Sequence, residues 1–173
     1  IGLGYALQED ADAPTFIGIT SDRNLDKVKK IGLYDQCLSY DAISEIDAEI
    51  PTVIVDMSGN TSVLAALHSR LGDHMKFTHK VGVTHWTSAK PQEGIIKERS
   101  AFFFAPDHIK KLMQEWGPKR FEQETSAFLM TTASKAKAWL KFRHVNGLEE
   151  LAAIHPAVCQ GAIPSDEALL VVL

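Results

Sequence analysis

The stretch of sequence that decides the fold is PTFIGITSDRNLDKVKKIGLYDQCLSYD, residues 14–41. An apolar, β-branched run at 15–19 reads as a strand and ends at small polar residues. A helical pattern follows at 23–31, and a second short strand follows at 36–40. Strand, helix and strand at this spacing are typical of a parallel sheet that is covered by helices.

The same alternation continues along the chain. We expect strands at 52–56, 77–83 and 100–106, with a helix over 62–72 that ends at Gly72. The run TVIVD at 52–56 is apolar without alternation, which is expected of a strand that is buried on both faces. The sequence therefore predicts an α/β fold with a Rossmann-like, doubly wound parallel sheet.

The last third of the chain has a different pattern of predicted helices and strands. Residues 106–135 are predicted to be helical, with a break at Gly117 and Pro118. A strand at 138–145 then leads to a helix at 147–161 that is interrupted or bent near Pro156, and to a terminal strand at 168–173. We expect residues 1–135 to form a partial dinucleotide-binding domain and residues 136–173 to form a separate C-terminal segment.

The first ten residues, IGLGYALQED, read as the second half of an amphipathic helix. We expect an upstream part to be absent from this chain, with any glycine-rich phosphate loop just before Ile1. The predicted sheet is then incomplete at its N-terminus.

Composition narrows the class of protein. The chain has 173 residues, 45% of them hydrophobic, and a net charge of −4, which argues against a nucleic-acid-binding protein. No apolar run reaches the roughly 20 residues that a membrane span needs. Cys37 and Cys159 have no CxxC partner, so we expect free thiols and a cytoplasmic location.

Polar residues at the end of the first expected strand form the first candidate site. In a nucleotide-binding α/β domain, the tip of the second strand meets the adenosine ribose. Hydroxyl, Arg and Asn side chains there suit a 2′-phosphate, which predicts NADP rather than NAD. The alternative is a helix N-terminus capped by Ser21 or Asp22 with solvated charges, and the sequence leaves it open. The candidate cofactor-binding residues here are Thr20, Ser21, Arg23, Asn24 and Tyr40.

The ends of the next two expected strands form the second candidate site. Ligands of parallel α/β sheets collect at the carboxyl ends of strands, and glycine lets the backbone approach a ligand closely. The alternative for DMSGN, residues 56–60, is a plain strand-to-helix turn capped by Ser58 or Asn60. The candidate cofactor-binding residues here are Asp56, Gly59, Val81, Gly82 and Thr84.

The sequence gives weaker indications of catalytic residues, of a metal site and of a subunit contact. His85 could donate a proton and Trp86 could stack on a ligand, although such a pair is more often packing. No set of residues has zinc-ligand spacing, and there is neither a GxSxG nor an HExxH motif, so we expect no metal. The FFF run at 102–104 fits a core strand or a strand at a subunit edge.

Taken in order, GITSDRN, KKIGLYDQCLSYD, TVIVDMSGN, LAALHSRLGD and VGVTHW resemble the cofactor-binding half of zinc-independent medium-chain dehydrogenases, most nearly quinone oxidoreductases. ITSDRN, VDMSGN, VGVTHW and FFFAPDHIKK are similar to an uncharacterised branch known only as a domain-of-unknown-function family.

The resemblance implies that Ser21, Arg23, Asn24 and Tyr40 face the NADP 2′-phosphate and adenosine, and that Gly59, Gly82 and Thr84 approach the nicotinamide. It also implies that the terminal helix and strand return to a catalytic domain, and it suggests a homodimer. Neither the catalytic domain nor the pyrophosphate-binding turn is in this chain, and THW at 84–86 departs from typical quinone reductases.

Three functions remain at this point. The first is an NADPH-dependent reductase of a small quinone, enone or carbonyl substrate, with hydride transfer from the nicotinamide. The second is a catalytically inactive NADP-binding sensor or scaffold, because no convincing acid–base pair is visible. The third is a methyltransferase, which Ser21 and Arg23 disfavour because such domains prefer an acid at the second strand tip.

Overall fold

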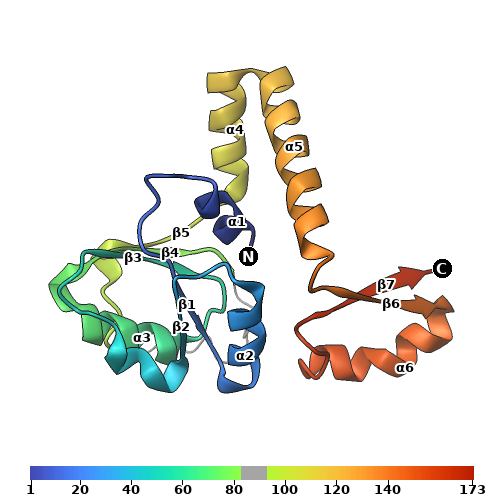
Figure 1. The fold of residues 1–173 in the computed structure, drawn as a ribbon, viewed down its shortest axis with the longest axis horizontal. Coiled ribbons are helices and arrows are strands. Elements are labelled where there is room, and N and C mark those ends of the chain that lie inside the picture. The colour runs from blue at the N-terminus through green and yellow to red at the C-terminus, as the bar shows by residue number, and fades with distance from the viewer. Residues whose placement is uncertain (83–92) are drawn as a thin grey trace. The chain divides into compact units, whose positions relative to one another are not determined.

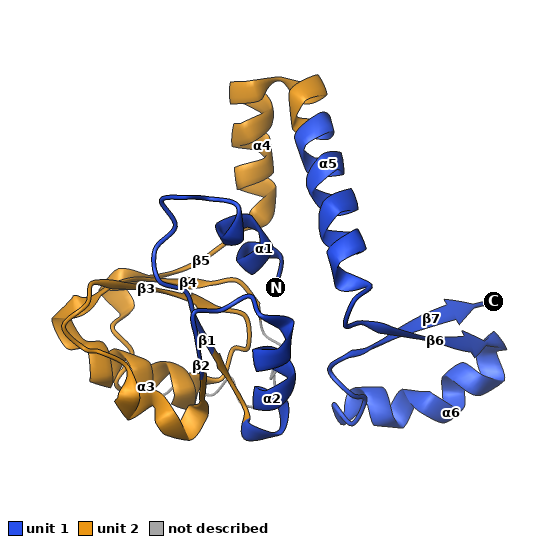
Figure 2. Cartoon of the chain, in the orientation of Figure 1, with its two compact units in different colours: residues 1–18, 22–37, 122–173 blue, residues 19–21, 38–121 orange. Residues whose placement is uncertain are grey.

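The computed structural model describes residues 1–82 and 93–173 and shows an α/β fold with parallel strands (Figure 1). By its internal contacts the chain divides into two compact units (Figure 2). The first unit comprises residues 1–18, 22–37 and 122–173, and the second comprises residues 19–21 and 38–121. Each unit contains a parallel strand pairing of its own.

A three-stranded parallel sheet organises the second unit, with the order β3-β4-β5. Its elements are η1 (Tyr40–Glu45), β3 (Thr52–Asp56), α3 (Thr61–Leu71), η2 (Gly72–His74), β4 (Met75–Lys80), η4 (Lys97–Arg99), β5 (Ser100–Phe102) and α4 (Ala105–Trp116). The predicted strand, helix and strand of this region are confirmed. β5 is shorter than predicted, because α4 begins at Ala105 with Pro106 in its first turn, where proline is well tolerated.

Helix α3 covers one face of this sheet (Figure 1), and its Leu64, Ala65, Leu67 and Leu71 are buried. Ile54 of β3 and Met75 of β4 are buried beneath it. On the other face, the side chains of Val53 and Val55 are 56% and 38% exposed. Within the described residues of this unit, the expectation that TVIVD is buried on both faces is not met, because alternate residues of a strand point to opposite faces and only one face carries a helix of the same unit.

A parallel βαβ motif forms the C-terminal part of the first unit. β6 (Lys141–Asn146) and β7 (Glu167–Val172) pair in parallel through α6 (Gly147–Cys159). Val145 and Ile154 are its buried residues. The terminal helix and strand are confirmed. Because α6 continues through Pro156, an interruption there is wrong, and the alternative of a bend stays a prediction.

The remaining elements complete the chain. α1 (Gly2–Gln8) and α2 (Asp22–Ile31) lie in the first unit, and β1 (Ile17–Thr20) pairs with β2 (Gln36–Ser39) in a two-stranded sheet. α4 is separated from α5 (Pro118–Ala136) at Gly117, whose φ is 77°, so the predicted break is confirmed. Within residues 1–82 and 93–173, no helix has the length and apolar character needed to cross a bilayer.

Candidate functional site

The backbone of Asp56 joins the carboxyl ends of β3 and β4. Its carbonyl oxygen accepts the backbone N–H groups of Val81 at 2.8 Å and Gly82 at 3.3 Å. The last residue of β3 is therefore hydrogen-bonded to the loop that leaves β4. Two strand-end loops, residues 57–60 and 81–82, are held side by side at this edge of the sheet.

The side chain of Asp56 shapes the first of these loops. Its Oδ1 accepts hydrogen bonds from Ser58 N at 2.9 Å, Ser58 Oγ at 3.0 Å and Gly59 N at 3.0 Å. Gly59 has a φ of 68°, a left-handed conformation that a side chain disfavours. These bonds form an Asx-type turn, so the loop has a fixed shape that does not depend on a ligand.

Asn60 then begins helix α3. Its Oδ1 accepts the backbone N–H groups of Ser62 at 3.2 Å and Val63 at 3.3 Å, which is the usual arrangement of an N-cap. The capped strand-to-helix turn weighed from the sequence is therefore present. It coexists with a glycine-containing edge that could still approach a ligand.

Gly82 lies against the other strand-end loop. A Cβ atom built on Gly82 would lie 2.8 Å from the backbone oxygen of Met57, a distance that real Cβ atoms essentially never show. The structure thus brings Asp56, Gly59, Val81 and Gly82 together at one edge of the sheet. Thr84, His85 and Trp86 lie outside the described residues.

The residues of the first candidate site are divided between the two units. Thr20, Ser21 and Tyr40 belong to the second unit, and Arg23 and Asn24 belong to the first. Whether the five form one site stays a prediction.

Within the first unit, the helix that carries Arg23 and Asn24 contacts the turn before β7. Arg23 is exposed in the first turn of α2. Asn24 Oδ1 accepts a hydrogen bond from Ser165 Oγ at 2.9 Å. The amide of Asn24 therefore has a structural partner that the sequence did not reveal.

Lys27 makes a second contact between α2 and this turn. Its Nζ lies 2.5 Å from Asp166 Oδ1, and Lys141 Nζ lies 3.1 Å from Asp166 Oδ2. The hydrogen bond from Lys27, followed by the one from Lys141, lowers the pKa of Asp166 to about 2. No local pattern could have predicted this cluster, because Lys27 and Asp166 are 139 residues apart.

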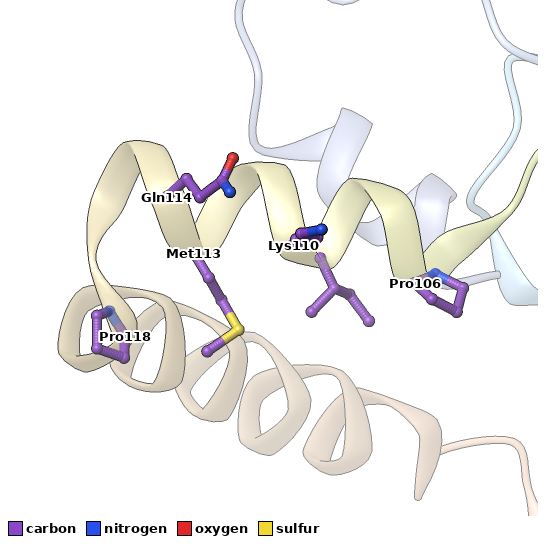
Figure 3. A pocket seen from close by; sticks show the side chains of 6 residues that line it. Pro106, Lys110, Met113, Gln114 and Pro118 are labelled. Atoms are coloured by element: carbon purple, nitrogen blue, oxygen red, sulfur yellow. The ribbon is translucent and has the colours of Figure 1, made fainter.

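An open hollow of about 470 Å³ runs along α4 and its end (Figure 3). Its lining is mostly apolar, and it contains none of the candidate cofactor-binding residues that the sequence predicts. A charged dinucleotide would find a single cationic side chain there. The lining residues are Pro106, Ile109, Lys110, Met113, Gln114 and Pro118.

Fold and strand-end loops together define the class of this chain as an α/β protein with parallel strands. The chain belongs to the family described as "Protein of unknown function (DUF2855)", whose model matches residues 1–164. Comparisons with curated proteins and with solved structures gave no match.

Proposed function

We propose that this chain is the NADP(H)-binding part of a zinc-independent, oxidoreductase-like protein. It would reduce a small quinone, enone or carbonyl substrate by hydride transfer from the nicotinamide. The observation that carries the proposal is the edge at which Asp56 joins β3 and β4, with Gly59 and Gly82 in the adjoining loops. Dinucleotides bind open parallel sheets outside the carboxyl ends of the strands, where glycine permits close approach.

In this proposal the strands of the β1-β2 and β3-β4-β5 sheets belong to one Rossmann-like, doubly wound sheet that is incomplete at its N-terminus. The exposed side chains of Val53 and Val55 support it, because parallel sheets are almost always covered on both faces. The β6–α6–β7 motif would belong to a catalytic-type domain. Its exposed Leu170 and Val172 are consistent with a covering partner.

Arg23 is the residue that we propose for selection of NADP over NAD. Lys27, one turn further along α2, is already paired with Asp166, whereas Arg23 is exposed. A guanidinium forms short, bidentate hydrogen bonds with a phosphate. We also propose that the protein is cytoplasmic and that it forms a homodimer through the strand around 102–104.

The experiment compares two variants of the full-length protein, each of which removes one positive charge from α2. Arg23→Ala should weaken NADPH binding about tenfold or more and leave NADH binding nearly unchanged, since a charge-assisted phosphate contact contributes about 1.5–3 kcal/mol. Lys27→Ala removes the same charge from the same helix but should leave the NADPH-to-NADH affinity ratio unchanged. Calorimetry measures both. Equal loss of both cofactors in Arg23→Ala contradicts the role of Arg23, and absence of NADPH binding by the unmodified protein contradicts the whole proposal.

A second candidate function is an NADP-binding sensor or scaffold without turnover. Asp56, the carboxylate at the proposed cofactor edge, uses its Oδ1 for three hydrogen bonds within its own loop, which favours a structural rather than an acid–base role. If this second function is correct, NADPH would raise the melting temperature of the protein without being oxidised. NADPH oxidation in the presence of any quinone or enone would exclude this candidate.

A further inference from the structure

His68 on α3 is bonded at both ring nitrogens although it is almost completely buried. Its side chain is 1% exposed, and Thr78, its partner on β4, is fully buried. The backbone N–H of Ile96 donates to His68 Nδ1 at 2.9 Å, and His68 Nε2 lies 2.9 Å from Thr78 Oγ1. The segment that precedes β5 is thereby tied to the helix that covers the sheet.

The directions of these bonds fix the protonation state of the ring. A backbone N–H can only donate, so Nδ1 must be the unprotonated nitrogen and Nε2 must carry the hydrogen. Nε2–H then donates to Thr78 Oγ1, and the Thr78 hydroxyl donates to Met75 Sδ at 3.5 Å. Every member of this chain of bonds is satisfied only while His68 is neutral.

We propose that His68 is a pH-sensitive latch that releases Ile96 from α3 when the ring takes up a second proton. A proton on Nδ1 would face the N–H of Ile96, so two donors would meet and the bond would be lost. Gly94, two residues earlier, lies against Ala65 of α3, where a Cβ would be 3.7 Å from the alanine Cβ. The residues that leave α3 are therefore 94–96.

The charges around His68 oppose protonation in the closed state. Burial lowers its pKa first, followed by the positive charges of Arg99 on η4 and Lys80 on β4. On its own helix, Arg70 is turned away and donates to the backbone oxygen of Ile46. Protonation is therefore coupled to release, because release opens the ring to water and raises its pKa from the lowered value of the closed state toward its ordinary range.

Hydrogen bonds that do not involve His68 limit how far this segment can move. Its carbonyl oxygen accepts a hydrogen bond from Ser100 Oγ at 2.7 Å, and Arg99 is bonded to the backbone oxygen of Met75 at 2.6 Å. Neither bond involves His68, so the residues from 97 onward keep their attachment. Release is therefore confined to residues 94–96.

Amide hydrogen exchange of Ile96 in the full chain, measured by NMR between pH 7.5 and 5 and corrected for intrinsic rates, tests the latch. Protection should be constant above about pH 6.5 and should fall as the pH drops below that value, by up to about tenfold per pH unit. His68→Asn, whose Oδ1 can take the place of Nδ1 without titrating, should abolish the fall. Ser100→Ala should lower protection at every pH and keep the slope.

Two results would overturn the latch. One is pH-independent protection of Ile96 in the unmodified chain, which needs no variant. The other is an unchanged fall in folded His68→Asn. His155→Asn, at an exposed histidine of α6, controls for general effects of histidine titration and should behave like the unmodified chain.

Discussion

A side chain on Gly82 would place its Cβ 2.8 Å from the backbone oxygen of Met57, so the two strand-end loops fit together only because residue 82 is glycine. Gly82→Ala forces backbone against backbone, since no flexible side chain can move aside. Overpacking of this kind costs about 1–3 kcal/mol. Chemical denaturation should show that loss in the free energy of unfolding.

Gly2→Ala is the matched control for this change. Gly2 lies in α1, and a Cβ atom built on it would meet no other atom within 4 Å. Alanine is the better helix former, so its free energy of unfolding should be unchanged or higher by up to about 1 kcal/mol. Equal stability of the Gly82 and Gly2 variants would contradict the close approach at Met57.

Asp56→Ala tests whether the carboxylate holds the first strand-end loop. The change removes the acceptor of three hydrogen bonds to Ser58 and Gly59, and should cost about 2 kcal/mol. Asp56→Asn keeps an oxygen in the same place and should cost less than about 1 kcal/mol. Thermal or chemical denaturation distinguishes the two. An alanine variant as stable as the asparagine variant would show that the oxygen has no such role.

The order of helices and strands could be predicted from the sequence because each signal is local. Apolar runs, a capping residue such as Asn60 and a break such as Gly117 act within a few residues of themselves. The exposure of Val53 and Val55 could not be predicted in this way. An apolar strand shows that two faces can be covered, but not which of them carries a helix.

The candidate site, like the fold, could be predicted from the sequence only in part. Asp56, Gly59 and Gly82 were predictable as strand-end residues, because the carboxyl ends of neighbouring parallel strands share one edge. The bond between His68 and Ile96 spans 28 residues and depends on how α3 packs on the sheet. No periodic pattern marks such a pair, and the pairing of Lys27 with Asp166 is hidden for the same reason.

Tyr5 of α1 is joined to Trp139, which follows α5, by a hydrogen bond. The Trp139 Nε1–H donates to the Tyr5 hydroxyl at 2.9 Å, and Tyr5 is 7% exposed. Tyr5→Phe keeps the ring and leaves a half-buried indole N–H without its acceptor, so we expect a loss of about 1 kcal/mol in the free energy of unfolding. A double-mutant cycle with Trp139→Phe measures the coupling. Strict additivity would mean that the bond contributes nothing.

Asp166 gives the first unit a pH dependence of definite sign. Because Lys27 and Lys141 lower its pKa to about 2, the folded chain holds its proton less tightly than the unfolded chain does. The stabilisation is complete above about pH 4, the unfolded pKa, and is lost as the pH falls toward 2.

Asp166→Asn should be less stable than the unmodified chain at pH 7 and should remove this part of the acid sensitivity, as measured by denaturation at several pH values. Both pairs are partly exposed, so added salt should reduce the difference. An Asp166→Asn variant that loses stability between pH 4 and 2 as steeply as the unmodified chain would show that the two lysines do not hold this carboxylate in solution.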